Sequence, residues 1–435
     1  MRYLVPIIIV TATLLALDLY VYHNWKRFAR EGRVRWTLHV YRLLVPVMPL
    51  TLPAYLYLYS WWEVEPRLAR ALFFSLWALY YLPKVPIVVV LLLKDAARLV
   101  RAIGARRTAA SRSDAERTAA SRSDAERIPA SRSGTERIVA SRSGTERIDR
   151  AEFLRRVGWS AAAIPFIATG YGVYRTLYDF SVHRVEIPVA GLPTAFDGMT
   201  IAQLSDLHAG SLFSARPMWD AVALTNELQP DLVALTGDFV NNDVEEMARV
   251  LPALNALRAT VGVFGCLGNH DHYADTDRLV EQIDTTPIDL LVNEHRTIQM
   301  DGSRLHVIGT DNTGFRQHHA DLPRAVAGIE NGDGAQILLA HDPTFWDIGV
   351  RPDYRHIDLM LCGHTHGGQF GVEFGPLRWS LAALRYERWA GLYVEPRSDG
   401  QGDQFLYVNR GIGTVGPPLR MGIRPEITLL TLRRV

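Results

Sequence analysis

The residues that could carry out chemistry follow directly after short apolar runs in the second half of the chain. Five of these runs are followed by Ser205-Asp206-Leu207-His208, Thr236-Gly237-Asp238, Gly268-Asn269-His270-Asp271, Ala340-His341-Asp342-Pro343 and Cys362-Gly363-His364-Thr365-His366. Carboxylate, imidazole and amide groups form a mixed nitrogen and oxygen ligand set, which suits Mn, Fe or Zn better than Mg alone. In Asp206-x-His208 and His364-x-His366, the spacing on extended backbone points both side chains the same way. The pattern therefore predicts a metal site.

The apolar runs, and the amphipathic segments between them, are typical of an α/β fold. Strands are predicted at Met199–Leu204, Leu232–Thr236, Val261–Leu267, Leu305–Gly309, Gln336–Ala340 and Ile357–Leu361. Helices are predicted at Arg216–Glu227, Val244–Ala256, Asp277–Asp284 and Asp321–Glu330. Ligand sites in open α/β sheets lie at the carboxyl ends of strands, which is where the polar segments stand.

The first half of the chain has the composition of a membrane region. A helix crosses a bilayer with roughly 20 apolar residues, and the stretches Leu4–Tyr22, Leu43–Trp62, Ala71–Leu93 and Val157–Tyr174 meet that length approximately. Asp18 and Lys84 interrupt two of these stretches. Isolated charges are costly in lipid, so these two side chains could face each other inside a bundle. We expect three transmembrane helices in residues 1–93, a linker over 94–156, a fourth helix over 157–174 and an α/β domain over 180–435.

The linker over residues 94–156 is repetitive and basic. The decapeptide RTAASRSDAE at Arg107–Glu116 recurs unchanged at Arg117–Glu126, and two related copies follow. Its small and polar residues cannot bury enough surface to offset their ordering entropy, so we expect a disordered segment. Attraction to anionic lipid headgroups is a second interpretation of these repeats.

Charge predicts the orientation of the chain in the membrane. The linker holds sixteen basic and nine acidic residues. The first loop, which follows the first predicted helix and runs from Lys26 to Arg42, holds six basic residues against one acidic. The positive-inside rule places both segments in the cytoplasm and the α/β half outside the cytoplasmic (inner) membrane. Residues 1–174 carry a net charge of +13 and residues 175–435 one of −12. The total of +1 argues against a general nucleic-acid binder.

In this order, the polar motifs resemble those of the calcineurin-like metallophosphoesterase superfamily. The resemblance covers about Thr200 to Thr431. Within the superfamily, the run GHTHGGQ at 363–369 and the segment YVNRGIGT at Tyr407–Thr414 are similar to the bacterial membrane-linked branch. Four preceding membrane helices also resemble the animal transmembrane proteins with a metallophosphoesterase domain. The resemblance implies two mixed β-sheets sandwiched by helices, following an N-terminal region of four transmembrane helices.

The resemblance also implies a dinuclear metal centre and assigns roles to nine residues. The first metal would be held by Asp206, His208 and His366, and the second by Asn269, His341 and His364, with Asp238 bridging both. His270 would protonate the leaving oxygen or stabilise the charged transition state, and Asp271 would orient His270. Two dications clamp the attacking and leaving oxygens of an in-line phosphoryl displacement, and their bridging water is a hydroxide near neutral pH.

Several other residues have two interpretations each. His272 follows the GNHD run closely enough to contact substrate, or it has no part in the site. Arg410 and Arg420 flank a Gly-rich turn and could bind a phosphate or lie on the surface. Cys266 and Cys362 end two predicted strands, where buried free thiols are favoured over a disulfide.

Together, these features favour a membrane-anchored phosphoesterase with two divalent metal ions, Mn, Fe or Zn. Its substrates would be phosphate esters, with phosphodiesters of lipid or envelope components the natural candidates, and membrane lipids would be its partners. A lipid-precursor pyrophosphatase on the cytoplasmic face is an alternative that requires the opposite topology. A non-catalytic receptor with a vestigial metal site would have lost ligands, and none is lost here. A transporter with a fused domain has little support, because the helices show no obvious repeat.

Overall fold

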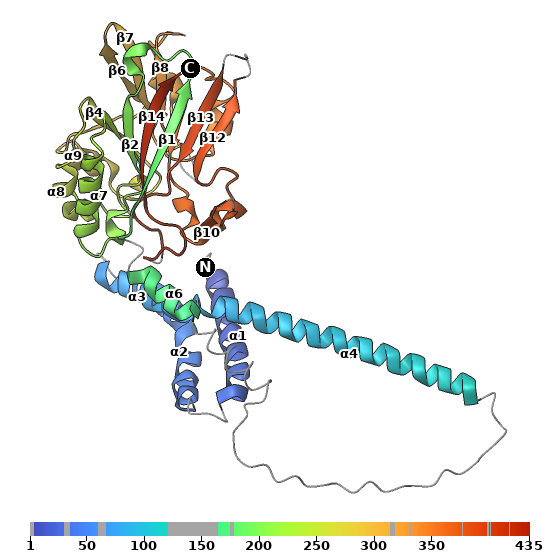
Figure 1. Ribbon diagram of the computed structural model, residues 1–435. Helices are drawn as coiled ribbons and strands as arrows, with labels where there is room; N and C mark the ends of the chain where they lie inside the picture. Colours follow the sequence, from blue (N-terminus) through green and yellow to red (C-terminus); the bar gives the residue numbers. More distant parts are fainter. Residues whose placement is uncertain are drawn as a thin grey trace, which may run out of the picture. The chain divides into compact units, whose positions relative to one another are not determined.

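The computed structural model describes residues 4–29, 35–59, 67–120, 164–174 and 178–435, apart from 314–317, 331, 376, 398, 399, 401 and 417. The chain divides into two compact units (Figure 1). The first comprises Met1–Trp62 and Tyr80–Ile167, and the second comprises Glu63–Leu79 and Ala168–Val435.

The described residues of the N-terminal region are mainly helical. Its helices are α1 (Leu4–Ala29), α2 (Trp36–Tyr59), α3 (Arg67–Tyr81), α4 (Lys84–Ala120) and α6 (Ile164–Tyr174). Among the described residues, two stretches are long and apolar enough to cross a membrane, Ile7–Lys26 and Phe73–Ala105.

The four predicted transmembrane spans differ in how well they match the observed helices. The first lies within α1, and the second falls largely within α2, which contains Pro46, Pro49 and Pro53. The third is not one regular helix, because a turn at Leu82–Pro83 separates α3 from α4. Pro83 favours this break because proline disfavours helical backbone at the residue before it. Of the fourth span, residues 157–163 lie outside the described part of the chain.

The predicted pairing of Asp18 with Lys84 is confirmed. Lys84 Nζ lies 2.5 Å from Asp18 Oδ1, and both side chains are buried within the first unit. The Tyr41 and Tyr81 hydroxyls donate to the same carboxylate at 3.2 and 3.4 Å, and the ammonium lies 3.0 Å from the centroid of the Tyr80 ring. The charges are therefore paired and surrounded by polar and aromatic groups, which is how an apolar environment accommodates them.

The expected disorder of the linker is wrong for its first part. Helix α4 continues through residues 94–120 and includes the first decapeptide repeat. Alanine and arginine have high helix propensity, so an existing helix can extend through this sequence at little cost. Residues 121–156 lie outside the described part of the chain.

Two six-stranded mixed sheets form the second unit, as the resemblance implied. Their strand orders are β1-β14-β2-β3-β4-β5 and β12-β13-β9-β8-β7-β6, and β10 and β11 form a separate hairpin. The strands are β1 (Ser181–Val189), β2 (Thr200–Leu204), β3 (Leu232–Thr236), β4 (Gly262–Cys266), β5 (Ile288–Leu290), β6 (Glu294–Met300), β7 (Ser303–Gly309), β8 (Ala335–Leu339), β9 (Leu359–Cys362), β10 (Gly371–Phe374), β11 (Leu377–Ser380), β12 (Gly391–Pro396), β13 (Asp403–Val408) and β14 (Glu426–Arg434).

Alternation along the strands builds apolar layers on both faces of each sheet. In β3, Leu232 and Ala234 pack between the two sheets, whereas Val233 packs toward the helices. The helices of this unit are α7 (Arg216–Glu227), α8 (Leu251–Leu254), α9 (Thr276–Ile283) and α10 (Leu322–Ala325). Helices α7 to α9 cover the first sheet, and α10 covers the second. Because both faces of the central strands are buried, these strands are continuous apolar runs.

Two predicted helices are shorter than expected. The segment Val244–Ala256 divides into a 3₁₀ helix, Val244–Arg249, and the single turn α8. Pro252 stands in the first turn of α8, where its missing N–H costs nothing. The predicted helix Asp321–Glu330 is only Leu322–Ala325.

Candidate metal centre

The candidate ligands lie at the carboxyl ends of strands from both sheets. Asp206 and His208 follow β2, Asp238 follows β3 and Asn269 follows β4, while His341 follows β8 and His364 and His366 follow β9. Hydrogen bonds join these loops both within one sheet and between the two sheets. Asp206 N–H donates to Gly237 O at 3.0 Å, and the backbone N–H of His364 donates to Asp206 Oδ1 at 3.0 Å. The site is therefore assembled where the ends of the two sheets meet.

The backbone at the candidate ligands is strained. Five of them have left-handed φ angles, namely Asp206 (+50°), His208 (+41°), Asp238 (+55°), His364 (+69°) and His366 (+52°). Such angles are uncommon for residues other than glycine and cost about 1–3 kcal/mol each, so they persist where the surroundings impose them. Glycines allow the strand-end loops to lie close to one another. A Cβ atom at Gly268 would collide with Asp238, and one at Gly363 would collide with Asp206.

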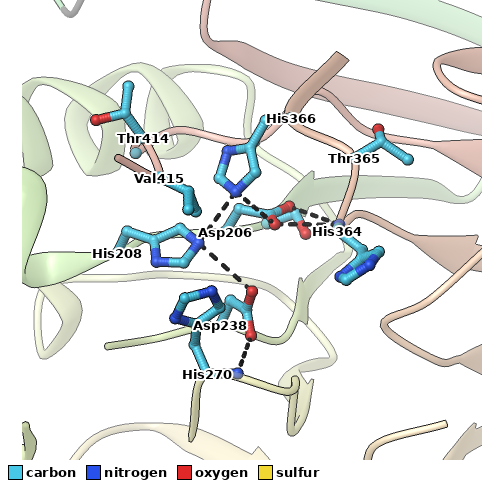
Figure 2. Close-up of polar contacts among 12 residues, drawn as sticks. Asp206, His208, Asp238, His270, His364, Thr365, His366, Thr414 and Val415 are labelled. Atoms are coloured by element: carbon cyan, nitrogen blue, oxygen red, sulfur yellow. Dashed lines mark hydrogen bonds and ion pairs between the residues drawn. The ribbon is translucent and has the colours of Figure 1, made fainter. Parts of the chain in front are cut away.

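One buried group comprises Asp206, His208, Asp238 and His366. His366 Nε2 lies 3.3 Å from Asp206 Oδ1 and 3.1 Å from His208 Nε2. His208 Nε2 lies 3.4 Å from Asp238 Oδ2. Figure 2 shows the His208 and His366 imidazoles converging with the two carboxylates. Their ligand atoms can therefore share one ion.

A second group comprises Asp238, His341 and His364. His341 Nε2 lies 3.0 Å from Asp238 Oδ2, and His364 Nδ1 lies 3.3 Å from His341 Nε2. The other ring nitrogen of His341, Nδ1, lies 2.7 Å from the carbonyl of Thr236. A proton on Nδ1 donated to this carbonyl leaves Nε2 with its lone pair, as a ligand needs. Asp238 belongs to both groups.

Asn269 fits the expected ligand set by a different observation. Its side-chain nitrogen donates to the Tyr273 hydroxyl at 3.2 Å. Its side-chain oxygen is buried and has no hydrogen-bond partner among the residues that the structure describes. A buried acceptor without a partner is costly, and a cation would supply one. The residues present therefore fit a pair of divalent ions.

The charges of the two groups are tightly coupled. Burial opposes ionisation of Asp238, but His341 and His208 outweigh it and hold the pKa of Asp238 well below its ordinary range. Burial likewise lowers the pKa of His341, yet Asp238 raises it to about 10. Burial lowers the pKa of His208 and of His366. His208 and His366 are therefore neutral, as metal ligands must be, whereas a cation bound at His341 would displace the proton that Asp238 favours there.

The structure gives Asp271 a different role from the expected one. Its carboxylate accepts hydrogen bonds from the backbone N–H groups of Asp238, Phe239, Val240 and Gly268, at 2.8–3.2 Å. None of the hydrogen bonds in the described part of the chain joins Asp271 to the His270 ring. Asp271 therefore fixes the loops that carry Asp238 and Asn269. A buried carboxyl group needs hydrogen-bond donors, and here the backbone of these loops supplies them.

The group that orients His270 is the backbone carbonyl of Asn241. His270 Nδ1 lies 2.6 Å from this oxygen, and the backbone N–H of His270 donates to Asp238 Oδ1 at 2.8 Å. The His270 and His208 rings meet edge to face, with centroids 4.7 Å apart. Sequence reasoning missed Asn241, and no motif could have indicated it, because any residue offers a carbonyl.

Neither arginine of the Gly-rich turn is a surface residue. Arg420 is fully buried and donates to the carbonyls of Arg410, Gly411, Gly413 and His366. It thereby ties the turn to the loop of His364 and His366. Arg410 is also buried and is ion-paired with Glu373 and Glu426. Both guanidinium groups are occupied by protein acceptors, so their role here is to support the site.

Two further predictions concern single residues. His272 is a member of neither ligand group; its Nε2 lies 2.6 Å from Asp311 Oδ1, and its ring is stacked on His319. It therefore belongs to a separate polar cluster. Cys266 and Cys362 are buried free thiols, as predicted.

Comparisons with known proteins agree with the geometry. Residues 1–177 match the family described as "Probable Calcineurin-like phosphoesterase, transmembrane domain", and residues 199–368 match "Calcineurin-like phosphoesterase". The metallophosphoesterase YkuE of Bacillus subtilis is 30% identical over 296 residues, which cover 66% of this chain and 98% of that protein. The chain belongs to the calcineurin-like metallophosphoesterase family.

Two other relatives of this phosphoesterase are similar to it over more than half of its length. A zebrafish "transmembrane protein with metallophosphoesterase domain" is 31% identical over 285 residues, which cover 63% of this chain and 62% of that protein. The phosphodiesterase YaeI of Escherichia coli is 31% identical over 240 residues, covering 53% of this chain and 80% of that protein. Family membership and the buried Asp and His groups identify a metal-dependent phosphoesterase with an N-terminal transmembrane domain.

Proposed function

We propose that this phosphoesterase hydrolyses phosphodiesters of lipid or envelope components, from a site outside the cytoplasmic membrane. The observation that carries the chemistry is the position of Asp238, whose carboxylate serves both ligand groups. A shared carboxylate reduces the repulsion between two close cations. The phosphodiesterase name of the relative YaeI supports a diester substrate.

The residues around the site divide the work of hydrolysis. Asp206, His208, Asp238 and His366 would hold one ion, and Asp238, Asn269, His341 and His364 the other. When bound, such a pair of ions polarises the phosphoryl oxygens and generates the nucleophile from water. His270, held through Nδ1 by the Asn241 carbonyl, presents Nε2 to the site and would give a proton to the leaving oxygen. Asp271 and Arg420 hold the ligand-bearing loops in place through hydrogen bonds to their backbone.

A substrate screen on the purified full chain tests this function. We expect hydrolysis of bis(p-nitrophenyl) phosphate, with slower hydrolysis of p-nitrophenyl phosphate, since a monoester places an extra negative charge among the ligand carboxylates. Chelation should abolish both activities, and adding back Mn²⁺, Fe²⁺ or Zn²⁺ singly should identify the metal. Activity that survives exhaustive chelation would contradict the proposal. Faster hydrolysis of the monoester would contradict the diester assignment and indicate that the substrate is a phosphomonoester.

The outward orientation rests on charge. The basic residues of the first loop and of the 94–156 linker oppose translocation, whereas the second half, with a net charge of −12, carries no equivalent barrier. Since the linker precedes the final helix of the membrane domain, the catalytic half should lie on the opposite side from the linker.

Single-cysteine labelling tests this orientation, because both native cysteines are buried. Ala327→Cys is exposed in the catalytic half, and Ser111→Cys lies in the first decapeptide repeat. In intact cells, we expect a membrane-impermeant maleimide to label Ala327→Cys before the inner membrane is permeabilised and Ser111→Cys only afterwards. The opposite order would place the enzyme in the cytoplasm and favour the lipid-precursor pyrophosphatase.

A further inference from the structure

The hairpin that follows the metal-ligand loop has one polar face and one apolar face. Strands β10 and β11 pair antiparallel, with Val372 opposite Trp379 and Phe374 opposite Leu377. Because side chains alternate along a strand, these four residues share one face, called here the hairpin face. Their exposed fractions are 47% for Val372, 81% for Phe374, 61% for Leu377 and 48% for Trp379. Single exposed apolar residues are normal on a protein surface, whereas several that lie side by side are typical of an interaction surface.

The opposite face of the hairpin is fastened to the catalytic site. Glu373 accepts hydrogen bonds from Arg378 and Arg410, and Ser380 donates to the carbonyl of Gly367. The 3₁₀ helix that follows β11, Leu381–Leu384, adds two more exposed leucines. It leads to Tyr386, whose hydroxyl lies 3.0 Å from His364 Nε2. The hairpin face and the metal-ligand loop therefore form one connected piece.

The hairpin lies at the end of the catalytic unit where β1 begins. Arg410 is ion-paired with both Glu373 of β10 and Glu426 of β14, and Glu426 is the register partner of Ser181, the first residue of β1. The backbone N–H of Gly371 also donates to the carbonyl of Met421, 2.9 Å away. Figure 1 shows β10 at the end of the sheets opposite the C-terminus.

The start of β1 is also where the chain leaves the membrane domain. The match to the transmembrane family ends at residue 177, and β1 begins at Ser181. Four residues span at most about 14 Å when fully extended. The chain therefore enters the catalytic unit, at the end that carries the hairpin face, only four residues after the match to the transmembrane family ends.

We infer that the hairpin face inserts into the bilayer and seats the metal centre at the lipid headgroups, so that the substrate is a phosphate ester of a membrane lipid. Apolar side chains enter about 5–10 Å into the interface, where tryptophan is favoured and arginine meets anionic headgroups. Trp379 stands on the hairpin face, and the exposed Arg385 directly follows Leu384 of the adjoining 3₁₀ helix. The substrate class rests on the proposed phosphodiesterase activity, whereas the insertion itself does not.

Depth-sensitive labels test the insertion in the full chain reconstituted in phosphatidylcholine nanodiscs, with and without phosphatidylglycerol. Val372→Cys and Val394→Cys offer a matched pair, because Val394 is 50% exposed on the edge strand β12, outside the hairpin. We expect an NBD label at position 372 to shift to the blue and to be quenched by doxyl-labelled lipid, while the label at 394 is unaffected. Equal, unquenched labels would overturn the inference. Protection at 372 that depends on protein concentration, without lipid quenching, would assign the face to a second copy of the chain and overturn it equally.

Activity measurements on a membrane-embedded and a soluble diester distinguish a defect in membrane insertion from a defect in catalysis. The double variant Phe374→Ser/Leu377→Ser should lose at least about tenfold in activity on a diester lipid embedded in nanodiscs, since burial of one such side chain corresponds to about tenfold or more in an equilibrium constant. Its activity on soluble bis(p-nitrophenyl) phosphate should match that of Val394→Ser and of the wild type. Equal losses on both substrates would contradict a docking role. A wild type inactive on the soluble diester would refute the proposed function and leave the quenching result interpretable.

Discussion

Asp238→Asn should empty both metal sites and lower activity by about 10³-fold or more. Asp238 Oδ2 lies within 3.4 Å of ligand nitrogens from both groups, so the substitution removes the one negative charge that the two sites share. A metal ion contributes several kcal/mol to the stabilisation of transition-state charge, and each 1.36 kcal/mol is tenfold in rate. Elemental analysis of the purified full chain, with the rate on a soluble aryl diester, measures both effects.

Two matched variants separate this effect from general damage. His366→Ala should mainly deplete the first group, since Asp238, His341 and His364 stay intact. Asp358→Asn changes another buried carboxylate, which directly precedes β9 and accepts from the backbone N–H of Gln336 and from Arg397. It should keep both metals and the wild-type rate. An Asp238→Asn protein that retains two metals per chain would contradict the shared-carboxylate assignment.

His270→Ala should lower turnover by about 10²–10⁴-fold while leaving the metal content unchanged, which is the usual cost of losing one general acid. The ring is held by the Asn241 carbonyl and packs edge to face against His208, but it is not a member of either ligand group. The loss should grow as the leaving alcohol becomes less acidic, because a good leaving group departs without a proton. A series of aryl and alkyl diesters measures this dependence.

The neighbouring histidine provides the control. His272→Ala removes an imidazole two residues further along the chain, whose nitrogens contact Asp311 and Thr276. It should leave both the rate and its dependence on the leaving group close to those of the wild type. A His270→Ala enzyme whose loss is the same for every leaving group would assign His270 to transition-state charge stabilisation instead of proton transfer.

Side-chain chemistry at strand ends could be predicted from the sequence because of how buried parallel sheets are built. Their strands are continuous apolar runs, so the polar segments after them stand out, and carboxyl ends gather at one edge. Strands outside this pattern were not predicted. The partly exposed β6 and the hairpin strands β10 and β11 carry polar or mixed residues, and pairing with neighbours, rather than local composition, makes them strands.

The sequence by itself determined the candidate ligands, the division into a basic membrane half and an acidic catalytic half, and the pairing of Asp18 with Lys84. These depend on residue type and local spacing, or on the high cost of an isolated charge in lipid. Only the tertiary structure decided that Asn241 rather than Asp271 holds His270, that Arg410 and Arg420 are buried behind the site, and which face of the hairpin is left exposed. These depend on contacts between distant segments, such as the hydrogen bond from His364 to Asp206 across 158 residues of chain. Local sequence constrains such contacts only weakly, because they form when two separately folded sheet edges are brought together.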